Sequence, residues 1–194
     1  MKNTKTSTMV TYALLIAIIV IMGFTPLGYL KVGAIEITFI TIPVIIGAIT
    51  MGPACGAVLG ATFGITSFIQ CFGMSPFGSA LLGINPILTF ILCVVPRTLM
   101  GWLCGIIFKA IKNKSGFLVA SLSGALLNTI FFVLGLVLMF GRTEYITTMI
   151  DSLGGGNLFA FLVAFVGING LIEAVVCAVL GTAIAAGVYK GIKK

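Results

Sequence analysis

Histidine is absent from this chain of 194 residues, and its cysteines are few and scattered. Structural zinc and haem attachment depend on histidine or on closely spaced cysteines, and none of the five cysteines forms a C-x-x-C pair. Buried cysteine otherwise behaves as a small apolar residue. We therefore expect no metal site, no disulfide framework and no cofactor in this chain.

Two motifs of nucleotide and acyl chemistry are also missing. Neither the P-loop pattern G-x-x-x-x-G-K-[ST] nor the nucleophile pattern G-x-S-x-G occurs. An enzyme usually needs paired titratable groups near the membrane interface, and Arg97 with Glu173 is thin support for one. We expect no enzyme, and any ATP must be used by a partner chain.

Charge is the scarcest property of the sequence. Charged residues make up 8% of the chain and hydrophobic residues 60%, whereas a soluble domain carries roughly a quarter charged residues. Because the apolar residues form long runs, we predict an all-α polytopic membrane protein, with residues 1–194 as a single integral-membrane domain. The net charge of +7 favours a membrane surface over nucleic acid, since the basic residues lie mostly at helix ends.

The apolar runs predict six transmembrane helices. Val10–Gly23 follows two lysines as a secretory signal does, but no small-residue cleavage site follows it, so we interpret it as a retained helix. Gly52 and Pro53 predict a tight turn. Pro96 predicts either a kink in the fourth helix or the start of its regular part, because proline lacks a backbone donor. The predicted spans are about 8–24, 37–51, 53–70, 86–110, 116–140 and 158–189.

The lysines fix the orientation of these helices, because basic residues concentrate in cytoplasmic loops. With six spans, eight lysines share one side, and an odd number of spans would break this pattern. Both termini are then cytoplasmic. The eight residues are Lys2, Lys5, Lys109, Lys112, Lys114, Lys190, Lys193 and Lys194.

Polar residues within the spans gather in the outer half of the membrane. At about 1.5 Å per residue, Arg97 lies about 18 Å above the cytoplasmic end of its helix, and Glu173 about 25 Å. A pore would need polar lining along its full length, so we predict a cup that opens outward and has an apolar floor. The predicted site residues are Arg97, Asn128, Glu173, Asn169, Thr38, Thr66 and Gln70.

Arg97 allows two interpretations. It could form an ion pair with Glu173 that holds two helices together, or its guanidinium could bind an anionic group of a ligand, and both can hold at once. Guanidinium suits carboxylate because it binds with two parallel hydrogen bonds. Asn128 and Asn169 each offer a donor and an acceptor, for a ligand or for another helix.

The outer loops and the small residues complete the prediction. Loops 25–36 and 71–85 could close over a ligand, whereas 141–157 resembles a flexible linker from which Asn157 could reach the cup. Glycines four residues apart in the third helix favour close packing within the chain. Ala13 and Ala17 in the first helix could instead form a docking face for another membrane protein.

Three stretches resemble the substrate-binding S components of energy-coupling factor (ECF) vitamin transporters. They are TPLGYLKVGAIEITFITIPVIIGAITMGPACGAVLGATFG, NPILTFILCVVPRTLMGWLCG and NGLIEAVVCAVLG. The resemblance implies capture of a vitamin from outside by a protein of a bacterial cell membrane. It also implies docking to a transmembrane coupling protein and two ATPases through Ala13 and Ala17, followed by toppling and release inside.

The pantothenate-type branch is the most similar. Pantothenate has one carboxylate, one amide and two hydroxyls, which suit Arg97, Asn128 and Asn169. The only tryptophan, Trp102, falls in the inner half, so few aromatics are available to sandwich a flavin. Riboflavin, pyridoxine and, least, folate stay open as vitamins. A stand-alone secondary transporter, which would need inverted repeats, and a membrane scaffold stay open as other classes.

Overall fold

The computed structural model describes residues 4–26, 28–32, 35–111, 115–152 and 170–192. Most of these residues are helical, and one two-stranded hairpin interrupts the helices. The elements are α1 (Thr4–Phe24), β1 (Tyr29–Val32), β2 (Ile35–Thr38), α2 (Thr41–Met51), α3 (Pro53–Gln70), α4 (Pro76–Ile84), α5 (Pro86–Ala110), α6 (Gly116–Phe140), α7 (Glu144–Ser152), the π-helical turn η1 (Cys177–Gly181) and α9 (Thr182–Ile192).

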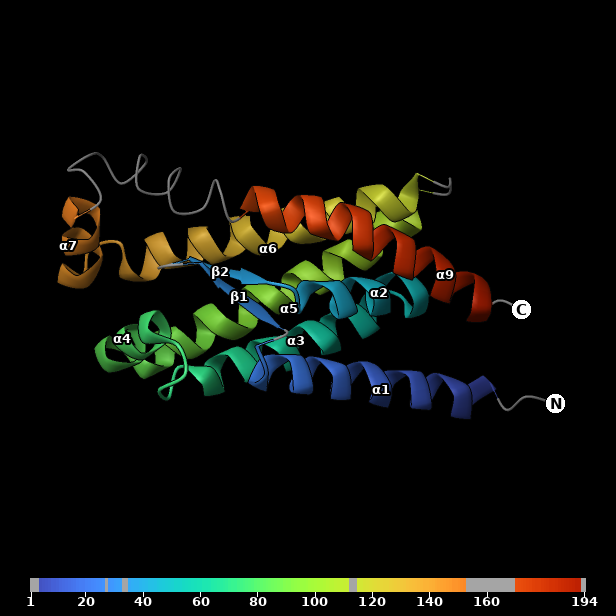
Figure 1. Ribbon diagram of the computed structural model, residues 1–194, viewed down its shortest axis with the longest axis horizontal. Helices are drawn as coiled ribbons and strands as arrows, with labels where there is room; N and C mark the ends of the chain where they lie inside the picture. Colours follow the sequence, from blue (N-terminus) through green and yellow to red (C-terminus); the bar gives the residue numbers. More distant parts are fainter. Residues whose placement is uncertain (1–3, 27, 33–34, 112–114, 153–169, 193–194) are drawn as a thin grey trace.

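The long helices run roughly along the long axis of the molecule (Figure 1). α1 begins and α9 ends at the same end, and α4 and α7 lie at the opposite end (Figure 1). This arrangement is the one expected if both termini face the same side of a membrane.

Four described helices are long and apolar enough to cross a membrane: Pro53–Gln70, Pro86–Ala110, Gly116–Phe140 and Gly170–Lys190. The first three have the bounds predicted from the sequence. Two further helices, over Thr8–Phe24 and Thr41–Met51, are apolar but shorter. Residues 158–169 of the sixth predicted span lie outside the described residues, so the count of six spans stays a prediction.

The start of the second predicted helix, at residue 37, was wrong. Residues 29–32 and 35–38 form two antiparallel strands in which Tyr29 pairs with Thr38, and α2 begins only at Thr41. The β-branched residues at the end of this stretch favour a strand, but they merge with an apolar run that hides the boundary. The all-α prediction therefore lacked this hairpin, and Thr38 ends a strand rather than lying in a helix.

The hairpin explains why α2 is short. Its 11 residues rise about 17 Å, roughly half of a bilayer core. The hairpin leads into α2 along the same direction (Figure 1). Non-helical backbone at membrane depth is tolerated where protein buries it or where it lines a water-filled cavity. Such an interruption is therefore a natural place for a binding site.

Two predicted loops contain helices. Within 71–85, Ser75 accepts a hydrogen bond from the backbone N–H of Gly78 at 3.3 Å and starts α4, with Pro76 in its first turn. Within 141–157, Glu144 begins α7, where an acid suits the positive end of the helix dipole. The expectation of a flexible linker was wrong for residues 144–152.

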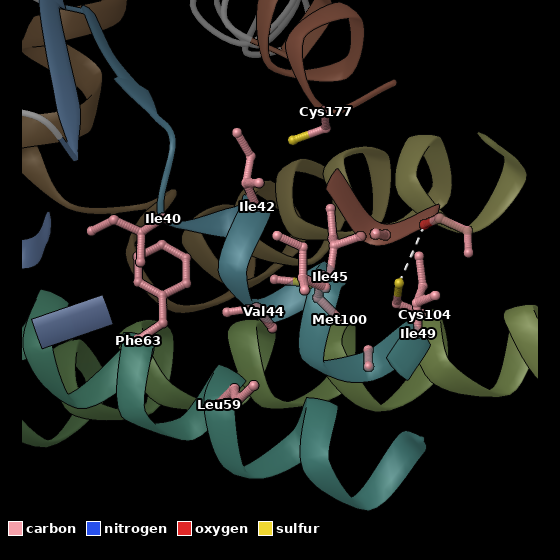
Figure 2. Packing of buried hydrophobic residues seen from close by; sticks show 14 of the residues in the cluster. Ile40, Ile42, Val44, Ile45, Ile49, Leu59, Phe63, Met100, Cys104 and Cys177 are labelled. Atoms are coloured by element: carbon pink, nitrogen blue, oxygen red, sulfur yellow. Dashed lines mark hydrogen bonds between the residues drawn. The ribbon is translucent and has the colours of Figure 1, made fainter. Parts of the chain in front are cut away.

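α2 lies at the centre of the apolar core. Figure 2 shows its side chains among Leu59 and Phe63 of α3, Met100 and Cys104 of α5, and Cys177. Cys104 donates a hydrogen bond to the carbonyl of Ala120 at 3.2 Å, which joins α5 to α6. All five cysteines are buried thiols, as the packing interpretation predicts.

Glycines bring the backbones of α3 and α5 into direct contact. A Cβ at Gly56 would lie 2.1 Å from the carbonyl oxygen of Gly101, and one at Gly60 would lie 2.1 Å from that of Arg97. The predicted role of the α3 glycines in packing within the chain is confirmed. The contact at Gly60 also fixes the backbone that carries Arg97.

Candidate functional site

The candidate site begins with a proline inside α5. Pro96 has no N–H, so the carbonyl of Leu92, four residues earlier, lacks its helical donor. Nη1 of Arg97 donates a hydrogen bond to this carbonyl at 2.8 Å. The pair Pro96-Arg97 therefore creates an unpaired acceptor in the helix and supplies its donor from the next side chain.

Two aromatic rings hold the guanidinium of Arg97. Its Cζ lies 4.6 Å from the ring centroid of Phe132 on α6 and 5.5 Å from that of Phe63 on α3. Both distances fit cation–π attraction, which is stronger where water is excluded. The positive charge is thus held between three helices by rings and a carbonyl.

One nitrogen of the same guanidinium has no partner. Nε of Arg97 is buried and makes no hydrogen bond within the described part of the chain. Leaving a buried donor unsatisfied costs about 1–3 kcal/mol, and more for charged groups. An anion that accepted a hydrogen bond from Nε would recover this free energy.

A second polar cluster surrounds Glu173, which is 6% exposed. One oxygen of its carboxylate, Oε1, accepts hydrogen bonds from Thr41 Oγ1 at 2.5 Å and from Asn128 Nδ2 at 3.2 Å. These bonds connect α2 and α6 to the helical segment Gly170–Lys190. Oδ1 of Asn128 is buried and has no partner among the described residues, so this cluster holds an unused acceptor.

Arg97 and Glu173, both of which the structure describes, do not form an ion pair with each other. Arg97 contacts Leu92 and the two rings, whereas Glu173 contacts Thr41 and Asn128. Phe132 lies one helical turn from Asn128 on α6, so the two clusters share one helix face. The interpretation in which Arg97 only ties two helices together through Glu173 is not what the structure shows.

Three other predicted site residues have structural contacts. Thr66 Oγ1 donates to the carbonyl of Phe63 at 2.8 Å, and Gln70 Nε2 donates to the carbonyl of Gly23, which joins α3 to α1. Thr38 contributes its backbone carbonyl, at 3.4 Å from Thr41 Oγ1. Asn169 and Asn157 lie outside the described residues.

Sequence reasoning missed three residues of these clusters: Thr41, Phe63 and Phe132. Phe132 could have been found, because it follows Asn128 by four residues and such pairs share a helix face. Thr41 was hidden by the misplaced start of α2. Phe63 belongs to an apolar run, and nothing in that run separates it from ordinary core residues.

The predicted docking residues lie on an open apolar face. Ala13 and Ala17 of α1 are exposed, and large apolar residues of the same helix, such as Leu14 and Ile21, are about 59% exposed. Exposed apolar surface on a membrane helix meets either lipid or a partner protein. Small residues at this spacing allow another helix to approach closely.

A protein-family comparison bears directly on these clusters. The model of the family "ECF transporter, substrate-specific component" matches residues 7–185. The chain belongs to this family. Its helices, its polar clusters and its free α1 face therefore belong to a substrate-specific component, and the predicted resemblance is confirmed.

Two relatives cover nearly the whole chain. The pantothenic acid transporter PanT of Lactococcus lactis subsp. cremoris is 30% identical over 203 aligned positions, which cover 98% of this chain and 97% of the relative. The pantothenate transporter PanT of Leuconostoc mesenteroides subsp. mesenteroides is 31% identical over 196 positions, which cover 95% and 93%. Both are bacterial proteins named as transporters, and neither is named as an enzyme.

Proposed function

We propose that this protein captures pantothenate from outside the cell as the substrate-binding subunit of an ATP-driven ECF importer. The observation that carries the proposal is the buried Nε of Arg97, which has no partner among the described residues. A buried, positively charged donor without a partner is what an anion-binding site would offer to its ligand. The pantothenate transporters among its relatives support the choice of ligand.

The two clusters match the chemistry of pantothenate. Its carboxylate suits the guanidinium of Arg97, which binds carboxylate in a planar, bidentate manner. Its amide and hydroxyls suit Asn128, whose Oδ1 is a buried acceptor without a partner among the described residues. Glu173 holds the amide of Asn128 in place, so we assign it an orienting role. We assign no catalytic residue.

Transport itself depends on partners in this proposal. α1 docks onto a transmembrane coupling protein through Ala13 and Ala17, two partner ATPases use the ATP, and the protein topples to release the vitamin inside. The chain needs no cofactor of its own. It lies in a bacterial cell membrane as a multi-pass protein with both termini in the cytoplasm.

Calorimetric titration of the purified chain in detergent tests the ligand. Pantothenate should bind one-to-one and tightly without ATP, and riboflavin, pyridoxine and folate should not. If none of the four vitamins binds, the proposal of a vitamin site is contradicted. Tight binding of another vitamin keeps the capture role and overturns the choice of pantothenate.

The variant Arg97→Ala tests the residue. It should weaken pantothenate binding by about 1–3 kcal/mol through loss of a charge-assisted hydrogen bond. Arg142→Ala, at an exposed arginine beyond α6, is the matched control and should bind normally. Unchanged binding in Arg97→Ala would leave Arg97 a structural role only.

Proteoliposomes separate the proposal from a stand-alone carrier. The chain alone should give no sustained uptake under an ion gradient, and uptake should appear when the coupling protein, both ATPases and ATP are present. Uptake by the chain alone would favour a secondary transporter.

A further inference from the structure

The hydrogen bond from Arg97 to Leu92 uses one edge of the guanidinium and leaves another free. Nη1 donates to the Leu92 carbonyl at 2.8 Å. Nε, by contrast, is buried without a hydrogen-bond partner among the described residues. In a guanidinium, the N–H of Nε runs parallel to one N–H of Nη2, and this pair matches the two oxygens of a carboxylate. The edge best suited to a carboxylate is therefore the edge that the protein does not use itself.

Pro96 is the reason that the anchoring carbonyl is available. Any other residue at position 96 would donate its own N–H to Leu92 within the helix. Proline cannot donate this hydrogen bond, and Pro96 nevertheless lies inside α5, whose 25 residues continue on both sides of it. Without Pro96, Arg97 would compete with a backbone donor for its anchor.

The rest of the surroundings also fix this side chain. The guanidinium carbon lies over the rings of Phe132 and Phe63, and Gly60 packs against the backbone carbonyl of Arg97. An arginine held by its backbone, by two aromatic rings and by one nitrogen loses little further freedom when it binds a ligand, which favours tight binding.

We propose that Pro96 is a positioning residue that selects carboxylate substrates. By leaving the Leu92 carbonyl unpaired in the helix, it anchors Nη1 of Arg97 and presents the Nε–Nη2 edge to the substrate carboxylate. The inference rests on the proposed function. It adds a specificity determinant that does not contact the substrate and acts only through Arg97.

The test compares pantothenate with pantothenol, in which a primary alcohol replaces the carboxylate. The dissociation constant for pantothenol divided by that for pantothenate, both measured by calorimetry on the full-length protein, reports recognition of the carboxylate. In Pro96→Ala, the new N–H pairs with Leu92, so the ratio should fall about threefold to tenfold, as expected for one hydrogen bond. The affinity for pantothenol should stay the same, because this ligand has no carboxylate to meet Arg97. A merely structural defect would instead weaken the binding of both ligands.

Pro86→Ala is the matched control. Pro86 opens the same helix, where its missing N–H would have had no helical partner in any case. This variant should keep the wild-type ratio. Pro96→Val, which also restores an N–H and keeps more of the apolar volume at this buried position, should reproduce the effect of Pro96→Ala and serves if the alanine variant does not fold.

The outcomes separate this inference from the proposed function. Wild-type protein that does not bind pantothenate overturns both. Wild-type protein that binds pantothenate, with an unchanged ratio in Pro96→Ala, overturns only the role of Pro96. A higher ratio in Pro96→Ala overturns it as well, because the Leu92 carbonyl would then compete with the ligand instead of positioning Arg97.

Discussion

Gly60 of α3 lies against the carbonyl oxygen of Arg97 on α5, so closely that a Cβ at position 60 would come within 2.1 Å of this oxygen. Such a close approach of two backbones requires a small residue on at least one of the two helices, here the glycine of α3. The position of the candidate anion-binding arginine therefore depends on a glycine of a different helix.

The first prediction follows from this contact. Gly60→Ala should push α3 and α5 apart and lower the free energy of unfolding by roughly 1–3 kcal/mol, the usual cost of overpacking. It should also weaken pantothenate binding, because Arg97 moves with its backbone. Thermal unfolding in detergent and calorimetry measure the two effects. The control is Gly187→Ala in α9, where a Cβ would meet nothing within 4 Å; equal stability of both variants would contradict the role of the contact.

A second prediction concerns Glu173, whose Oε1 accepts hydrogen bonds from Thr41 and Asn128. Glu173→Ala leaves Asn128 Nδ2 without its acceptor and leaves Thr41 only the Thr38 carbonyl at 3.4 Å, so it should destabilise the protein by roughly 1–3 kcal/mol. Glu173→Gln keeps an acceptor oxygen of the same size and should cost clearly less. Melting temperatures of the two variants provide the measurement. Glu144→Gln, at an exposed position of α7, should melt like the wild type, and a Glu173→Ala variant as stable as the wild type would show that the carboxylate does not hold the helices.

The sequence allowed the long helices to be predicted well, and the physical reason is clear. In a membrane, every backbone group of a spanning segment must be satisfied within it, so apolar length alone defines a helix. The bounds 53–70, 86–110 and 116–140 agree with the structure for this reason. The strands Tyr29–Val32 and Ile35–Thr38 were missed because each has only four residues, and the apolar residues of the second strand run into those of α2.

The candidate site could be predicted only in part. Counting depth along the helices selected Arg97, Asn128 and Glu173, because a polar group at membrane depth is conspicuous among apolar residues. Two of their partners had a local signal, since Pro96 leaves the Leu92 carbonyl of the same helix without a donor and Phe132 shares a helix face with Asn128. Whether Arg97 of α5 meets Phe132 of α6 or Glu173 depends on the rotation of one helix against another, and no local pattern encodes that rotation.

A third prediction tests the aromatic cage of Arg97. Phe132→Leu should remove the closer ring, at 4.6 Å from Cζ, and keep most of the apolar volume. Pantothenate binding should weaken by about 0.5–2 kcal/mol, the range of a cation–π interaction, as measured by calorimetry. The control is Phe131→Leu, because residue 131 lies on another face of α6. This variant should leave pantothenate binding unaltered. Equal losses in both variants would indicate general loosening of α6 instead of a role for the ring.

A fourth prediction separates ligand capture from transport. Ala13→Trp places a bulky side chain on the exposed face of α1, where it should block close approach of the coupling protein. We expect pantothenate binding in detergent to be unchanged and ATP-driven uptake in proteoliposomes, with the coupling protein and ATPases present, to be largely lost. Leu138→Trp, at an apolar residue of α6 that is 82% exposed, is the matched control and should support normal uptake. If Ala13→Trp transports as well as this control, α1 does not provide the docking face, and the partner must bind elsewhere on the chain.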